Sequence, residues 1–374
     1  MIVEKRRLGK TGVDVTLLGL GGFHLVELST GDATALVNRY LDAGGNYLET
    51  AAAYGKGESE RKVGQVMRTR RDECYLATKV MDRDPQVAAA SIEQSLRSLQ
   101  TDHVDILFIH RVQTADDLAQ ILASGGVLEV VEAARKAGKT RWIGISGHGR
   151  PWAMRDLIEQ HSFDVLMTGF NYYDHFNYPE GQSDLVPRVL ELDMGLIGMK
   201  ALADGFLYRS AEPAIRYALS LPIHTLVVGA NTLEILDFDL QLAESFTPMS
   251  EAAKEDLYVS ALELGNYVCR QCGKCLPAPD GLNIPRIFEL EGWYDRQMWD
   301  QVVRDPADYA LRQRLRFWFE QQEEARVAYA QEAVQVDLGG DYSEAQERCP
   351  YGLQVGERLR MAHYKLTQEP YPFK

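Results

Sequence analysis

Between residues 13 and 238, short apolar runs rich in β-branched residues alternate with amphipathic stretches of about ten residues. This alternation is typical of repeated βα units, in which each strand is followed by a helix that packs on the sheet. There are eight apolar runs, and eight parallel strands can close into a barrel. The expected strands are Thr16–Gly19, Tyr47–Glu49, Cys74–Lys79, Val104–His110, Arg141–Ser146, Val165–Gly169, Gly195–Lys200 and Thr225–Val228. The pattern therefore predicts an α/β fold, a (β/α)8 TIM barrel.

The stretches between the expected strands have the features of helices. In Pro85–Leu99, apolar residues such as Ile92 and Leu96 recur at helical intervals, and the leading proline suits a first helical turn. Before the first expected strand, residues 6–8 and 13–15 form two short runs around a turn that contains glycine. We interpret these runs as a hairpin that plugs the bottom of the barrel.

The βα rhythm stops after about residue 247, where a different composition begins. A single barrel needs roughly 250 residues, so a large part of the 374-residue chain is left for a second module. That part contains four of the five cysteines and a helical segment, rich in Trp, Tyr, Arg and Glu, that runs to Ala333. We predict a barrel over residues 1–247 and a mainly helical extension with the cysteines over residues 248–374.

The charge balance narrows the classes of partner. The chain has 54 acidic and 40 basic residues, a formal net charge of −14, which repels phosphate backbones and anionic lipid surfaces. No apolar run approaches membrane-spanning length, and no apolar segment follows the charged N-terminus as in a secretory leader. Five cysteines in a chain of this length do not form a disulfide scaffold. We expect a cytoplasmic protein with no nucleic-acid or membrane partner.

Four residues with catalytic side chains stand at or near the ends of consecutive expected strands. Glu49 ends the second strand and Tyr54 follows it, while Lys79 and His110 end the third and fourth. The carboxyl ends of barrel strands meet in one pocket, so we expect these side chains to converge. Taken singly, each has a more common explanation, such as a surface ion pair or a buried histidine. Their occurrence together favours catalysis.

The chemistry of this set suits reduction of a carbonyl. Hydride transfer needs a proton for the oxygen, and a neighbouring ammonium would lower the pKa of a phenol from its usual value near 10. We therefore expect Tyr54 to donate the proton beside Lys79, with the ammonium held by the Glu49 carboxylate. His110 would polarise the carbonyl oxygen.

The residues around this set resemble the aldo-keto reductase family. The motifs that carry the resemblance are Gly44–Ala51, Tyr54-Gly55, Ser59-Glu60, Thr78-Lys79, Ile109-His110 and Gly144-Ile145-Ser146. The resemblance implies a (β/α)8 barrel that binds a nicotinamide cofactor, usually NADPH, without the Gly-rich dinucleotide fingerprint, which this chain also lacks. The family's catalytic Asp, Tyr, Lys and His map onto Glu49, Tyr54, Lys79 and His110.

Two features depart from the family pattern. Glu49 stands where the family has aspartate, and its extra methylene must bend the side chain or shift the Lys79 ammonium. For the cofactor carboxamide the family commonly uses a Ser-Asn pair and a Gln, whereas this chain has Ser146-Gly147-His148 and Met167. These departures leave open a barrel with altered chemistry that binds another ligand or catalyses a non-redox reaction.

The resemblance also implies a cofactor site. The expected contacts are Ser146, Asn171, Lys200, Gly229, Asn231 and Thr232. Residues 229–234 should place backbone amides and the Thr232 hydroxyl near the pyrophosphate at a helix N-terminus. This loop contains no Arg or Lys to pair with a 2′-phosphate, and the acidic residues that follow favour NADH if anything. The expected cofactor is NAD(P)H, with the preference between NADH and NADPH open; Lys200 could instead meet a substrate anion.

The cysteines of the extension have the spacing of an iron–sulfur site. Cys269, Cys272 and Cys275 form a C-x2-C-x2-C run, and Cys349, followed by proline, supplies a fourth thiolate of the ferredoxin type. We expect one 4Fe-4S cluster, with zinc as the alternative, although structural zinc sites typically group cysteines in two pairs. Ala278 stands where relatives with ferredoxin-like tails carry another cysteine, so a second cluster is not expected.

The leading hypothesis is an NAD(P)(H)-dependent oxidoreductase that interconverts a small-molecule carbonyl and an alcohol. The alternative from another class is an electron-transfer protein whose barrel is a scaffold for the cluster and which acts with a redox partner. Whether the cluster is structural or carries electrons is left open by the sequence.

Overall fold

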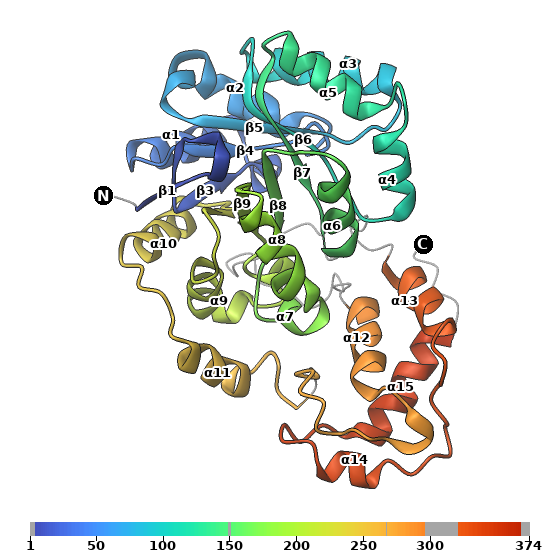
Figure 1. Ribbon diagram of the computed structural model, residues 1–374. Coiled ribbons are helices and arrows are strands. Elements are labelled where there is room, and N and C mark those ends of the chain that lie inside the picture. Colours follow the sequence, from blue (N-terminus) through green and yellow to red (C-terminus); the bar gives the residue numbers. More distant parts are fainter. Residues whose placement is uncertain (1–3, 149–150, 267, 296–320, 368–374) are drawn as a thin grey trace. The chain divides into compact units, whose positions relative to one another are not determined.

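The computed structural model describes residues 4–148, 151–266, 268–295 and 321–367 (Figure 1). The chain divides into two compact units. The first contains Met1–Asn171, Glu180–Ala203 and Arg209–Pro248, and the second contains Tyr172–Pro179, Asp204–Tyr208 and Met249–Lys374. Two short loops from the first part of the chain therefore belong with the extension. Residues 296–320 of the predicted Trp- and Tyr-rich segment lie outside the described residues.

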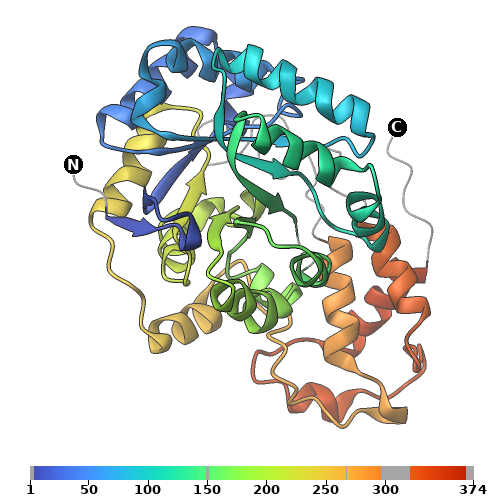
Figure 2. The same cartoon turned by 45° about the horizontal axis from the view of Figure 1, so that its top comes forward.

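A closed barrel of eight parallel strands forms the first unit (Figure 2). The strands follow one another around the barrel in chain order, and the last pairs with the first. Their bounds are β3 Leu18–Gly21, β4 Tyr47–Glu49, β5 Tyr75–Val80, β6 Val104–Ile109, β7 Thr140–Ser146, β8 Val165–Gly169, β9 Gly195–Met199 and β10 Thr225–Val228. The predicted (β/α)8 barrel is therefore confirmed, and the remaining strand predictions other than β3 agree within one residue at either end.

The first barrel strand was predicted wrongly. It spans Leu18–Gly21 in place of Thr16–Gly19, because Thr16 ends a separate strand of the N-terminal hairpin. The glycines of β3 resemble a turn in the sequence, but in the barrel they make room for neighbours. A Cβ on Gly19 would lie 2.8 Å from the Tyr47 ring. Local sequence does not reveal such a close approach.

Helices join the barrel strands and cover the outside of the barrel (Figure 2). The helices of the first unit are α1 Thr30–Asp42, α2 Glu58–Arg70, α3 Pro85–Leu99, α4 Ala115–Leu122, α5 Val127–Lys136, α6 Pro151–Gln160, α8 Val186–Glu191, α9 Ala211–Leu219 and α10 Leu233–Glu244. Helix α3 has the predicted bounds. The Asp84 carboxylate caps it by accepting from the amides of Gln86 and Val87 at 2.9 and 3.0 Å, and Gln100 ends it with a left-handed backbone.

The N-terminal hairpin contributes to the interior of the barrel. Strands β1 (Lys5–Arg7) and β2 (Asp14–Thr16) pair antiparallel, and the short 3-10 turn η1 (Gly9–Thr11) joins them. Leu8 is completely buried and belongs to the same apolar cluster as Tyr47, Phe108 and Ile197 from the barrel strands. The predicted plug is therefore confirmed.

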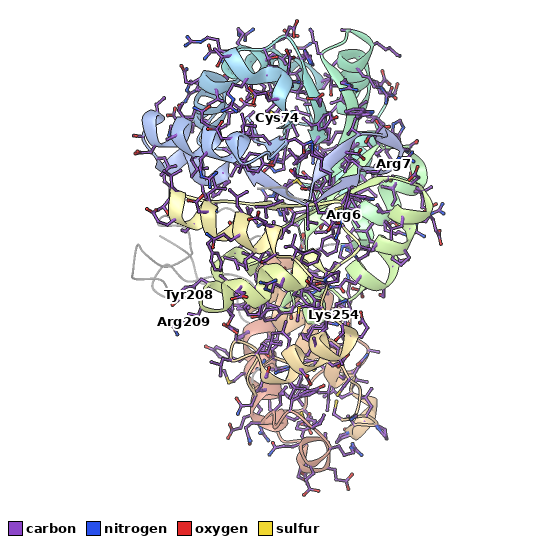
Figure 3. The ribbon with its side chains drawn as sticks, turned by 90° about the vertical axis from the view of Figure 1, so that its left-hand side faces the viewer. Arg6, Arg7, Cys74, Tyr208, Arg209 and Lys254 are labelled. Carbon is purple, nitrogen blue, oxygen red and sulfur yellow. The ribbon has the colours of Figure 1, made fainter. Side chains whose placement is uncertain are left out.

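The fifth cysteine, Cys74, is buried in the barrel. Cys74 precedes β5, is 6% exposed and lies with its sulfur 3.8 Å from that of Met67 on α2 (Figure 3). Burial raises the pKa of its thiol to about 12, so it behaves as a small apolar side chain.

The second unit has its own apolar core. Its helices are α7 Asp174–Asn177, α11 Glu251–Ser260, α12 Ile284–Asp295, α13 Gln321–Ala330, α14 Ser343–Glu347 and α15 Val355–Thr367. Ile287 and Leu290 of α12 pack with Tyr329 of α13 and Leu359 of α15 in one buried cluster. Among the described residues, no helix is long and apolar enough to cross a membrane.

Candidate active site

The side chain of Lys79 is the centre of the candidate site. Lys79 lies near the end of β5 and is 1% exposed. Its ammonium donates to the Glu49 carboxylate, to the Thr50 carbonyl oxygen at 2.9 Å and to the Tyr54 hydroxyl oxygen at 3.0 Å. An ammonium has three N–H groups, so these three acceptors use all of them. Because Lys79 donates to the phenol oxygen, the Tyr54 proton must point elsewhere.

His110 completes the predicted set of four. It follows β6, and its backbone amide donates to the Val80 carbonyl oxygen at 2.8 Å. Its imidazole lies edge-on to the Tyr54 ring, with 6.0 Å between the ring centroids. The buried Nδ1 atom has no hydrogen-bond partner among the described residues. The structure therefore brings Glu49, Tyr54, Lys79 and His110 together, as the strand-end argument predicted.

The pKa values of this site differ from the expectation in one respect. Burial raises the pKa of the Tyr54 phenol above its usual value near 10, whereas the sequence suggested that Lys79 would lower it. Burial also lowers the pKa of Lys79. Burial lowers the pKa of His110 well below 6.5, and the positive charge of Lys79 adds to this effect. Tyr54 therefore holds its proton at neutral pH, and the His110 imidazole is neutral.

Two of the residues predicted to bind a cofactor bury polar atoms that lack partners. Ser146 ends β7 and is fully buried, and its hydroxyl oxygen has no hydrogen-bond partner among the described residues. Asn231 follows β10 and is 5% exposed, and neither atom of its amide has a partner there. Burying such a group without a hydrogen bond costs about 1–3 kcal/mol. These atoms fit a site whose ligand completes their hydrogen bonds.

The loop after β10 is packed closely against the loop after β3. A Cβ on Gly229 would lie 2.1 Å from Cδ2 of the His24 ring, so the close packing of this ring requires glycine at position 229. His24 lies on the short helix η2 (Phe23–Glu27), and sequence reasoning did not identify it. Thr232 caps α10, where its hydroxyl oxygen accepts from the Ile235 amide at 3.2 Å.

The remaining predicted cofactor residues meet at the ends of two adjacent strands. Asn171 follows β8 and is fully buried, and its amide nitrogen donates to the Lys200 carbonyl oxygen at 3.1 Å. Lys200 follows β9 with a left-handed backbone at φ 58°. This bond fixes the spacing of the two strand ends.

Arg83 is a second residue that sequence reasoning missed. Its guanidinium donates to the carbonyl oxygens of His110 at 2.8 Å and Arg111 at 3.2 Å, and to the Asp117 carboxylate at 3.0 Å. These bonds hold the loop that carries the His110 ring. A lone arginine after a strand gives no sequence signal of this role, because two of its partners are backbone carbonyls and all three lie in a different segment of the chain.

The four predicted cluster cysteines lie in one neighbourhood of the second unit. Burial raises the pKa of the Cys269 thiol to about 12, and the nearby thiols of Cys275, Cys272 and Cys349 raise it further. Cys272 is exposed, and the other three are partly buried against the α12–α15 core. The described residues contain no group of three or more His, Cys, Asp or Glu side chains arranged to hold a metal ion.

Comparison with known proteins identifies the barrel. The family model described as "Aldo/keto reductase family" matches residues 17–237, which is more than half of the chain and includes Glu49, Tyr54, Lys79 and His110. The chain belongs to the aldo/keto reductase family. It is an oxidoreductase of that family.

Relatives of this aldo/keto reductase resemble it over the barrel length. It is 27% identical over 217 residues to the uncharacterized oxidoreductase YqkF of Bacillus subtilis, a match that covers 55% of this chain and 67% of the relative. It is 29% identical over 227 residues to L-galactose dehydrogenase of Arabidopsis thaliana, a match that covers 56% of this chain and 69% of the relative.

Solved structures share the fold of this aldo/keto reductase. The holo form of the aldo-keto reductase AKR11C1 from Bacillus halodurans matches with a TM-score of 0.59 and 23% identity, over 68% of this chain and 95% of that one. An aldo-keto reductase from Klebsiella pneumoniae in complex with NADPH matches with a TM-score of 0.56 and 20% identity. The match covers 69% of this chain and 95% of that one.

Proposed function

We propose that this protein interconverts a carbonyl and an alcohol with a nicotinamide cofactor, and that Tyr54 is the proton donor. The observation that carries the proposal is the hydrogen bond from the Lys79 ammonium to the Tyr54 hydroxyl oxygen at 3.0 Å. This bond leaves the phenol proton available to a substrate oxygen and places a positive charge beside the phenolate that forms when the proton leaves.

Each residue of the site has a separate role in the reduction of a carbonyl. Tyr54 gives its proton to the carbonyl oxygen, and Lys79 stabilises the resulting phenolate. Glu49 keeps the buried ammonium charged, since a lone buried ammonium would lose its proton. The neutral imidazole of His110 orients and polarises the carbonyl by donating a hydrogen bond.

The nicotinamide cofactor supplies or accepts the hydride when it is bound. Ser146 and Asn231 would hold it, because their buried polar atoms lack hydrogen-bond partners in the described part of the chain. The backbone amides at the start of α10 would meet its phosphates. The Klebsiella pneumoniae relative in complex with NADPH supports a nicotinamide here.

The glutamate that replaces the family aspartate supports reductase chemistry instead of opposing it. Glu49 reaches the Lys79 ammonium, and that ammonium still lies 3.0 Å from the Tyr54 oxygen. The extra methylene is therefore accommodated without separating lysine from tyrosine.

We also propose that Cys269, Cys272, Cys275 and Cys349 bind one 4Fe-4S cluster. Structural zinc sites typically group their cysteines in two pairs, whereas three of these cysteines follow one another at x2 spacing. Cys269, Cys275 and Cys349 also pack against one apolar core, which supports a shared cluster site. We propose no partner for electron transfer, because hydride transfer moves both electrons without a relay.

Binding and turnover of the cofactor test the reductase proposal. Anaerobically prepared full-length protein should bind NADH or NADPH, seen as a change in nicotinamide fluorescence. Tyr54→Phe should lower kcat with a panel of aldehydes and ketones by about 10²–10⁴-fold while cofactor affinity stays within about threefold, since the proton donor acts only in the transition state. Binding of neither cofactor, or undiminished turnover by the phenylalanine variant, contradicts the proposal.

A further inference from the structure

The fourth cysteine of the proposed cluster site lies far along the chain from the other three, and an arginine next to it bridges the gap. The Arg348 guanidinium donates to the carbonyl oxygens of Cys275 at 2.9 Å and Pro277 at 2.6 Å. The first carbonyl belongs to the last cysteine of the C-x2-C-x2-C run, and the second lies two residues beyond it. Because Arg348 directly precedes Cys349, these charge-assisted bonds hold the distant cysteine beside the run.

A second arginine, Arg270, lies in the C-x2-C-x2-C run and contacts the segment around Cys349. Arg270 follows Cys269, is 6% exposed and lies with its guanidinium carbon 4.9 Å from the centre of the Tyr351 ring. Its guanidinium also donates to the carbonyl oxygens of Tyr258 and Leu264, both at 3.1 Å. Arg270 thus anchors the start of the run to the end of α11 and stacks on a residue two positions beyond Cys349.

The two arginines also place positive charge where thiolates must form. Four cysteines deprotonate when they bind a metal centre, and thiolates in one neighbourhood repel one another. Arg270 directly follows Cys269 and lies over the ring of Tyr351, two residues beyond Cys349, so its charge is near both cysteine segments. None of these bonds requires a metal, so they act before one binds.

We propose that Arg348 and Arg270 are positioning residues that assemble the four-thiolate site before the metal arrives. The inference rests on the proposed cluster function. Arg348 lies in the segment around Cys349 and binds the C-x2-C-x2-C run, whereas Arg270 lies in the run and contacts the segment around Cys349. The two segments are therefore held together at two points. Without them, Cys349 would have to find the other three cysteines while the cluster forms.

Iron retention tests this role in the loaded protein. After anaerobic reconstitution of the full chain, Arg348→Ala should lose iron to a ferrous chelator about tenfold faster than wild type, read from the visible absorbance and from iron content per chain. Arg348→Lys keeps one charged donor and should lie between the two. Tyr351→Leu should behave like Arg348→Ala, whereas Tyr351→Phe, which keeps the ring face, should retain iron as wild type does.

Arg360 on α15 provides a matched control. It is exposed and also donates to two backbone carbonyl oxygens, those of Leu338 at 3.0 Å and Gly340 at 3.4 Å, but neither belongs to the cysteine segments. Arg360→Ala should therefore leave iron release unchanged. Equal release rates for Arg348→Ala and Arg360→Ala would overturn the proposal.

A cross-linking measurement on metal-free protein separates this inference from the cluster itself. A short bifunctional maleimide should join Cys349 to a cysteine of the run in wild type and in Arg360→Ala, and the yield should fall at least fivefold in Arg348→Ala. If wild type takes up no iron but shows this difference, the cluster proposal fails and the positioning role stands. If the yields are equal in a folded Arg348→Ala protein, the positioning role is refuted whatever the iron content.

Discussion

At the residue scale, the decisive feature is a buried ammonium whose charge depends on a buried carboxylate. Lys79 and Glu49 are 1% and 3% exposed, so neither charge is solvated. Breaking such a pair by removing one partner typically costs about 3–5 kcal/mol, because the other charge is left without compensation. The identity of residue 49 should therefore affect catalysis through the charge of Lys79, and affect it less through the length of the side chain.

Two substitutions at Glu49 separate charge from length. Glu49→Gln keeps the size of the side chain and removes the charge, so Lys79 should lose its proton more readily and kcat/KM should fall about 10²-fold. Glu49→Asp keeps the charge and restores the residue common in the family, so its kcat/KM should stay within about tenfold of wild type. The pH profile of kcat/KM is the measurement. Equal loss in the two variants would mean that length, not charge, governs the site.

At the element scale, the strand ends were predictable and the close contacts between loops were not. Hydrophobic periodicity located the strands, and the rule that their carboxyl ends converge brought Tyr54, Lys79 and His110 into one site. The contact of His24 with Gly229 could not be predicted, because it joins the first and last strands of a closed barrel. The strand shift at β3 also involves a close contact, since a Cβ on Gly19 would meet the Tyr47 ring of the neighbouring strand β4.

The N-terminal hairpin gives a prediction on stability. Leu8→Ala removes a fully buried side chain from the barrel interior, where the surrounding strands cannot close the cavity, and should lower the free energy of unfolding by about 2–5 kcal/mol. Urea unfolding followed by fluorescence measures this loss. Lys10→Ala at the exposed tip of the hairpin is the control and should change the free energy of unfolding by less than 1 kcal/mol. Gly12→Ala is unsuitable as a control, because a φ of 73° at this position would strain an alanine. A loss below 1 kcal/mol for Leu8→Ala would show that the hairpin does not seal the barrel.

At the scale of the whole molecule, the two units differ in how much of their function the sequence could predict. The barrel places its candidate catalytic residues at positions fixed by a regular fold, so spacing along the chain translates into position in space. The cysteine spacing indicated a metal centre, but the arginines that bind the two segments to each other act through carbonyl oxygens and a ring face. Such contacts depend on the path of two distant segments, which no local pattern encodes.

The stability of the whole chain should depend on pH because the barrel buries two neutral histidines. Burial lowers the pKa of His110 and His148 in the folded chain well below 6.5. At pH values between the lowered pKa and 6.5, the unfolded chain therefore binds more protons than the folded chain. Stability should therefore fall as the pH drops from 7.5 to 5.5, by about 3 kcal/mol for the two groups together.

Glu60 acts in the opposite sense, because burial raises its pKa. The double variant His110→Gln/His148→Gln leaves Glu60 in place, so urea unfolding of the two proteins at both pH values isolates the histidines. The wild type should lose about 3 kcal/mol more than the double variant over this range, and equal losses would show that the histidines are not held neutral.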